Sequence, residues 1–245
     1  MEPWFIFLIL GGALCAGFVT GLTGFGTALV LSASWLHFMD PVTVAPLAAV
    51  CSAAAQLACV YSMWRSFKWR MLMPYLAGAI IGVPIGVWLL DVIDPGIVKI
   101  GVGVFLILYT SYSLFVKNPP TVNVDSKLAD SVAGGGGGVL AGLGGFSGPI
   151  PLIWTQVRGL PKLIARGIYQ PYNLIVLACS AAMHAAAGNV TPQVGTMFLI
   201  ALPASTVGAM IGLRAFHRIS EKRFKQLVLT LLFCSGVLLL VRQAF

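Results

Sequence analysis

Two glycine-rich runs carry the strongest chemical signal in the sequence. Residues 20–27 and 142–148 place glycines and hydroxyl side chains inside otherwise apolar segments. A helix broken at such a point exposes backbone N–H groups, and N–H groups at a helix start favour anions. The runs therefore predict a substrate site for an anion, with Thr23, Gly24, Gly26, Gly144, Gly145 and Ser147 as binding residues and Thr20 and Thr27 as flanking donors.

A second polar cluster follows the later run. Pro171 is compatible with the first turn of a helix. This predicts Arg166 and Gln170 just before the helix begins and Asn173 in its opening turn. A guanidinium, two carboxamides and a helix end would then converge on one sulfur or carbon oxyanion. Alternatively, basic residues here only mark the cytoplasmic side of a membrane, which is the interpretation we prefer for Arg158 and Lys162.

Three further polar residues, Gln56, His184 and Asn189, interrupt or border apolar segments. Polar groups within a membrane usually face a cavity or another helix. His184 is a candidate proton relay, because imidazole titrates near neutral pH; a hydrogen bond between helices is the plainer alternative. No buried carboxylate stands out as a proton carrier.

The elements that must position these residues are membrane helices. The chain is 58% hydrophobic and only 9% charged, whereas an ordinary soluble domain carries roughly 25% charged residues. About 20 apolar residues cross a bilayer as a helix, and barrel strands would alternate apolar and polar residues instead. The composition therefore predicts an all-α integral membrane protein. Its apolar segments span residues 4–37, 42–63, 71–90, 96–116, 132–157, 163–187, 194–213 and 224–241.

The chain is predicted to consist of two homologous halves of four segments each. Gly21 corresponds to Gly142 and Pro46 to Pro171, and Gly82 and Gly86 correspond to Gly208 and Gly212, at nearly constant spacing. Such internal repeats define the architecture. We predict an N-terminal membrane repeat at 1–118, a polar linker at 119–131 and a C-terminal membrane repeat at 132–245.

The basic residues favour an inverted arrangement of the halves. If the glycine-broken first segment of each half is re-entrant, every Lys and Arg except Lys99 and Arg242 falls on one face, as the positive-inside rule requires. Each half then crosses three times, which inverts the second half, and both termini face away from the cytoplasm. Residues 65–70, the linker near Asn123, and residues 221–223 are predicted to be cytoplasmic. The alternative is eight full crossings, with the glycines serving only helix packing.

The sequence lacks the signature motifs of several classes of protein. The sequence has no phosphate-binding loop, no HExxH and no GxSxG motif, which argues against an enzyme. The net charge of +8 is explained by membrane orientation, so no nucleic-acid partner is expected. The five cysteines have no metal-ligand spacing, and neither a metal nor a cofactor is expected. The start of the chain lacks the basic region of a signal peptide, so the first segment is expected in the mature protein.

Taken together, the repeated segments, the run from Gly21 to Gly26, the run from Gly142 to Pro149, Leu160-Pro161 and Ala165-Arg166-Gly167 resemble the TauE/SafE family of membrane permeases. The resemblance covers essentially the whole chain, although Thr23 and Phe25 interrupt the first glycine run. It implies a multi-pass protein of the bacterial inner membrane. It also implies movement, often outward, of small anions such as sulfite, sulfoacetate, other organosulfonates or carboxylates.

Two classes of function therefore remain in view. The favoured one is a secondary transporter for a small anionic substrate, and the other is a non-transporting membrane subunit or assembly protein. A channel is a lesser alternative, because no ring of polar residues is visible without an oligomer. The lipid bilayer is an expected partner, and a coupling ion and a homo-oligomer are left open.

Overall fold

The computed structural model describes residues 3–60, 67–115, 122, 126–215 and 221–244, and all regular structure in these ranges is α-helical. The predicted all-α fold is confirmed. Arg65 and Asn123, predicted to be cytoplasmic, lie outside the described ranges. The helices are α1 (Pro3–Thr23), α2 (Thr27–Trp35), α3 (Pro41–Val60), α4 (Trp69–Val92), α5 (Pro95–Phe115), α6 (Lys127–Gly144), α7 (Pro149–Val157), α8 (Lys162–Ala186), α9 (Pro192–Ala215) and α10 (Glu221–Ala244).

Five helices of the described chain, α1, α3, α4, α5 and α9, are long and apolar enough to cross a membrane. Large apolar side chains such as Phe7, Ile80 and Leu199 point outward from the bundle, each more than two thirds exposed. Apolar exposure on this scale suits a surface in contact with lipid. The prediction of a multi-pass membrane protein is therefore confirmed.

The first predicted segment of each half is broken into two helices. The breaks lie at residues 24–26 and 145–148, where Gly24, Gly26 and Gly145 have φ of 84°, 107° and 77°. Glycine adopts this left-handed region without a Cβ penalty. At the second break the Gly145 N–H donates to Ala141 O at 2.8 Å and closes α6. Gly134 to Gly138 lie inside α6, so this glycine run is part of a helix.

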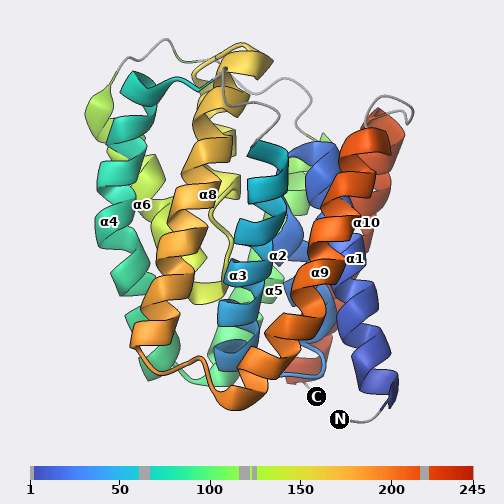
Figure 1. The fold of residues 1–245 in the computed structure, drawn as a ribbon. Coiled ribbons are helices and arrows are strands. Elements are labelled where there is room, and N and C mark those ends of the chain that lie inside the picture. The colour runs from blue at the N-terminus through green and yellow to red at the C-terminus, as the bar shows by residue number, and fades with distance from the viewer. Residues whose placement is uncertain (1–2, 61–66, 116–121, 123–125, 216–220, 245) are drawn as a thin grey trace.

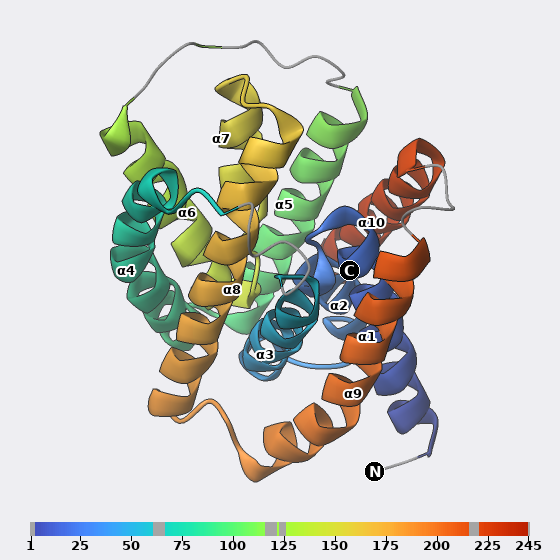
Figure 2. The same ribbon diagram turned by 45° about the horizontal axis from the view of Figure 1, so that its top comes forward.

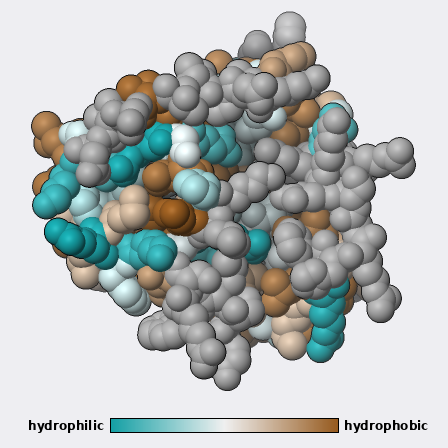
Figure 3. Space-filling view, turned by 90° about the horizontal axis from the view of Figure 1, so that it is seen from above, coloured by the Kyte–Doolittle hydropathy of each residue, from teal (hydrophilic) through white to brown (hydrophobic). Residues whose placement is uncertain are grey.

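Each broken segment returns to the end of the bundle from which it started. α1 and α3 begin at the end that holds both termini, whereas α6 and α8 begin at the opposite end (Figure 1). In two views, α4 and α6 lie on one side of the bundle and α1, α9 and α10 on the other, with α3 and α8 between them (Figure 2). Seen from the end opposite the termini, hydrophilic residues gather over the side that carries α4 and α6 (Figure 3).

Glycines allow two pairs of helices to approach closely, α1 with α9 and α4 with α6. A Cβ added at Gly208 of α9 would lie 2.2 Å from Leu14 O of α1, and one at Gly82 of α4 would lie 2.2 Å from Gly135 O of α6. Small residues allow such backbone contact between membrane helices. Tertiary packing thus explains why α6 stays helical despite its glycines.

The α4–α6 contact predicts opposite effects at two adjacent glycines. A Cβ at Gly134 would lie 2.1 Å from Tyr75 O, whereas one at Gly135 would meet nothing closer than 3.4 Å. We expect Gly134→Ala to lower the unfolding free energy by about 1–3 kcal/mol through overpacking. Gly135→Ala should be neutral or stabilising, because alanine favours a helix over glycine. Thermal unfolding of both purified variants tests this, and an equal loss of stability in both would contradict the packing assigned to Gly134.

Candidate functional site

The two helix breaks meet in the interior of the bundle and form a pocket with α3 and α8. Its wall combines both breaks with polar residues of the two central helices, Ser52 and Gln56 on α3 and Asn173 on α8. The space open to the centre of a water molecule is about 20 Å³. The polar and glycine residues that line it are Gly26, Thr27, Ser52, Gln56, Gly145, Ser147, Gly148 and Asn173.

Two helix N-termini point into this pocket without a side-chain cap. α2 follows Gly26 and α7 follows Gly148, and neither cap residue makes a capping hydrogen bond through a side chain. Uncapped N–H groups and the helix dipole attract negative charge. The first turn of α2 offers the N–H groups of Thr27, Ala28 and Leu29. α7 offers fewer donors, because Pro149 and Pro151 have no N–H.

Side chains tie the second break to α8. Ser147 Oγ donates to Asn173 Oδ1 at 3.0 Å, and both residues are buried. Tyr172 OH donates to Gly134 O at 2.5 Å, and Ser180 Oγ donates to Ala141 O at 2.9 Å. These bonds hold α6 and its break against α8, so the predicted proximity of Asn173 and the second glycine run is present in the structure.

Arg166 and Gln170 lie beside Gly24 of the first break. A Cβ at Gly24 would be 3.4 Å from Arg166 Nε and 3.4 Å from Gln170 Nε2. Gln56 on α3 contacts the same glycine, with Nε2 donating to Gly24 O at 3.0 Å. The prediction placed Arg166 and Gln170 at residues 142–148 alone, and the structure adds a contact with the other half of the chain.

The predicted start of the helix near Pro171 is wrong. α8 begins at Lys162 and continues through Pro171, so Arg166, Gln170 and Asn173 lie within the helix. Their spacing places them on one face. Pro171 cannot donate to Gly167 O, and the backbone N–H of Lys68 donates to that oxygen instead, at 3.2 Å. Satisfying the freed carbonyl from another segment is how membrane helices tolerate proline.

Two of the other predicted hydroxyl residues, Thr20 and Thr23, and Gly144 are not among the residues that line the pocket. Thr23 Oγ1 is 2.9 Å from Val19 O and 2.6 Å from Phe25 O, so its hydroxyl hydrogen bonds within the first break. Thr20 and Thr27 are joined through their hydroxyls across that break. Gly144 lines a separate small cavity with Ser32. Sequence reasoning missed Ser52, because a single serine in an apolar helix carries no distinguishing pattern.

His184 takes part in a chain of hydrogen bonds between helices. Its Nε2 lies 2.9 Å from Gly142 O, which makes this nitrogen the donor, and Nδ1 lies 3.3 Å from Asn189 Nδ2. Asn189 Nδ2 also donates to Asp91 Oδ1 at 2.9 Å. This is the plainer of the two roles considered for the residue, and it joins the end of α8 to α4 and α6. Asp94 accepts from Gly96 N at 2.7 Å at the start of α5.

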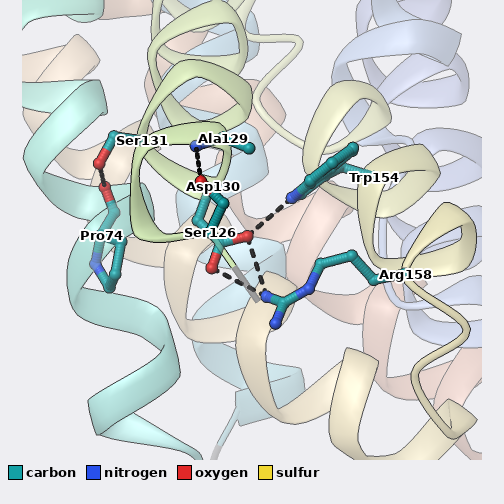
Figure 4. Close-up of polar contacts among 7 residues, drawn as sticks. All are labelled: Pro74, Ser126, Ala129, Asp130, Ser131, Trp154 and Arg158. Atoms are coloured by element: carbon teal, nitrogen blue, oxygen red, sulfur yellow. Dashed lines mark hydrogen bonds and ion pairs between the residues drawn. The ribbon is translucent and has the colours of Figure 1, made fainter. Parts of the chain in front are cut away.

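Arg158 is an ion-pair partner inside the bundle. Its Nη1 lies 2.9 Å and 2.8 Å from the two carboxylate oxygens of Asp130, and Trp154 Nε1 donates to Oδ1 at 2.7 Å (Figure 4). The two charged side chains are only 6% and 5% exposed. The interpretation of Arg158 as an orientation signal alone is therefore wrong, and Asp130, placed in the linker from sequence, is a buried residue of α6.

Comparison with known proteins identifies the chain. The sequence profile described as sulfite exporter TauE/SafE matches residues 9–239. No curated protein and no solved structure matches the chain in the corresponding searches. Among the residues that the structure describes, no group of three or more His, Cys, Asp or Glu side chains could hold a metal ion. The profile extends over both helix breaks and includes at least part of each of the ten described helices, and the chain belongs to the TauE/SafE sulfite exporter family of membrane transporters.

Proposed function

We propose that this protein is a secondary transporter that exports small anions across the bacterial inner membrane. Sulfite is the first proposed substrate, because the family to which the chain belongs is a sulfite exporter family. Sulfoacetate and other organosulfonates or carboxylates are proposed beside it as small anions of related chemistry. The single observation that carries the proposal is the meeting of two uncapped helix starts in one interior pocket. Membrane transporters bind anions at such broken helix ends near the middle of the bilayer.

The pocket must enlarge for transport. Its space of about 20 Å³ holds about one ordered water. An oxyanion such as sulfite is larger than a water molecule, so at least one hairpin must move away from α3 and α8 before the anion enters. Opening towards alternate faces of the membrane in turn would give alternating access around a fixed site.

An inverted repeat of residues 1–118 and 132–245 accounts for the helix packing. α1 of the first half packs on α9 of the second, and α6 of the second packs on α4 of the first. Under the proposed repeat α1 is equivalent to α6 and α4 to α9, so these two contacts are exchanged by the symmetry. The return of each broken segment to its starting end supports re-entrant hairpins (Figure 1). The end opposite the termini is then cytoplasmic, in keeping with the positive-inside rule.

Arg166 is expected to contribute directly to anion binding. Removal of a charge-assisted hydrogen bond costs about 1.5–3 kcal/mol, so Arg166→Gln should weaken sulfite binding roughly tenfold to a hundredfold. Arg70→Gln is the matched control, because Arg70 is an exposed cation of α4. Equilibrium binding of radiolabelled sulfite to the purified protein measures both.

Equal affinities of these two variants would remove Arg166 from the site. A complete lack of saturable anion binding in the unmodified protein, and of flux in proteoliposomes, would favour the alternative of a non-transporting membrane subunit or assembly protein. Arg158 does not serve as a control, because its replacement would leave the buried Asp130 carboxylate without its partner.

A further inference from the structure

Two buried carboxamides lie beside Gly24 of the first helix break. Gln56 of α3 is 2% exposed and Gln170 of α8 is fully buried. A Cβ added to Gly24 would lie 3.4 Å from each of Arg166 Nε, Arg166 Nη2 and Gln170 Nε2. Gln56 also lines the central pocket, so this cluster adjoins the proposed anion site on the side towards the start of α8.

The hydrogen bonds of Gln56 fix the direction of its carboxamide. The group that lies 3.0 Å from Gly24 O must be the NH₂, since two oxygens would repel. Oε1 of Gln56 then faces away and has no partner among the described residues. Neither the oxygen nor the nitrogen of the Gln170 carboxamide has a hydrogen-bond partner among the residues that the structure describes. A buried polar group left unsatisfied costs about 1–3 kcal/mol.

A ligand that satisfies these groups must both donate and accept hydrogen bonds. The carboxamide oxygens accept hydrogen bonds only, whereas the NH₂ of Gln170 and the guanidinium of Arg166 donate. A fully deprotonated oxyanion has no donor for the carboxamide oxygens. A monoprotonated oxyanion carries one O–H group and a single negative charge, which matches the single positive charge of Arg166.

Resting on the anion transport proposed above, we infer that the substrate is bound as a hydrogen oxyanion of the hydrogensulfite type. Its O–H group donates to a carboxamide oxygen of Gln170 or Gln56. Its remaining oxygens accept from Arg166 and from the NH₂ of Gln170. The two glutamines are therefore specificity residues that select a protonated monoanion over the dianion and over monoanions without a donor.

The test compares sulfite with methanesulfonate on the unmodified, purified protein across neutral pH. Sulfite loses its last proton in this range, whereas methanesulfonate stays a monoanion with no O–H. Among the described residues, the titratable groups near Gly24 and Gln170 include Arg166 on α8 and Cys59 on α3, which lies close enough to interact with Arg166. They also include Tyr169, whose ring packs against Phe25 of the first break and whose phenol is ordinarily neutral at pH 7. A guanidinium stays charged, and a thiol ordinarily stays neutral, at pH 7. Methanesulfonate is the control, because any pH dependence of its binding must come from titration of the protein and not of the ligand.

The expected result is that sulfite affinity falls about tenfold for each pH unit above the last ionisation of sulfite, because the protonated fraction falls by that factor. Methanesulfonate should bind more weakly and without this pH dependence. Gln170→Leu and Gln170→Met should each weaken hydrogensulfite binding roughly tenfold, which corresponds to the loss of one hydrogen bond. Each variant should also reduce the ratio of hydrogensulfite affinity to methanesulfonate affinity. The comparison on the unmodified protein decides the question even where neither variant folds.

Sulfite affinity that holds or rises with pH would overturn the inference while leaving anion transport intact. An unchanged ratio of the two affinities in folded Gln170 variants would overturn it as well, since the carboxamide would then be satisfied by water alone. Absence of binding for both anions at every pH would instead overturn the proposed function.

Discussion

Replacing Gly145 with leucine is expected to abolish transport while leaving the protein in the membrane. Gly145 closes α6 with φ of 77°, where a residue with a side chain is strained by about 1–2 kcal/mol. A Cβ there would lie 3.1 Å from Ala28 Cβ and 3.2 Å from Ala49 N. The rest of a leucine side chain would therefore push α2 and α3 away from the second break, which separates the two halves of the pocket.

Gly101→Leu is the matched control for this change. Gly101 lies in the apolar helix α5 and has no atom within 4 Å of the position of an added Cβ. Both variants should reach the membrane in similar amounts, because the apolar segments that direct insertion are unchanged. Substrate flux in proteoliposomes, normalised to reconstituted protein, should then be lost only in Gly145→Leu. Flux at the unmodified rate in that variant would place the substrate path away from the second break.

Breaking the ion pair between Asp130 and Arg158 is expected to cause the largest loss of stability. Its side chains are 5% and 6% exposed, and Trp154 Nε1 also donates to the Asp130 carboxylate. Either Asp130→Asn or Arg158→Gln leaves one buried charge uncompensated, which costs about 3–5 kcal/mol. The double variant removes both charges, so it should lose less stability than the two single variants added together. Thermal unfolding in detergent measures all three.

A second ion pair supplies the control. Asp40 and Lys99 are 3.4 Å apart at an end of the bundle, and the Asp40 side chain is 72% exposed. Exposed pairs contribute about 0–1 kcal/mol, so Asp40→Asn should shift the unfolding temperature little. Additive effects of Asp130→Asn and Arg158→Gln would show that the two buried charges do not depend on each other.

The sequence predicted the features that depend on local pattern. The apolar segments could be located because crossing a membrane demands long apolar runs, and the two breaks lie within the glycine runs because left-handed backbone favours glycine. The start of α8 was misplaced because another segment satisfies Gly167 O, which no local signal around Pro171 reveals. The pairing of Asp130 with Arg158 depends on the packing of α7 against α6, so spacing along the chain could not show it.

The candidate site was likewise predicted only in part from the sequence. Asn173 was expected near the second break and bonds to Ser147 there. Arg166 and Gln170 were assigned to that break as well, yet they lie against Gly24 of the first. Proximity along the chain suggested the second break only, whereas the packing of α8 beside α3 brings the first break to Arg166 as well. Contacts between the two halves follow from tertiary packing, which a single sequence does not encode as a local pattern.

The central claim is that one anion contacts both halves of the chain at the meeting of the two breaks. The most direct measurement is the initial rate of radiolabelled sulfite flux in proteoliposomes that contain the unmodified protein, Thr27→Val or Asn173→Leu. Thr27 belongs to the first break and Asn173 contacts the second, and both line the pocket. We predict saturable flux in the unmodified protein and a roughly tenfold or greater loss of apparent affinity in each variant, as expected for a lost hydrogen bond to an anion. Saturable flux with the same apparent affinity in all three proteins would contradict a site shared by the two halves.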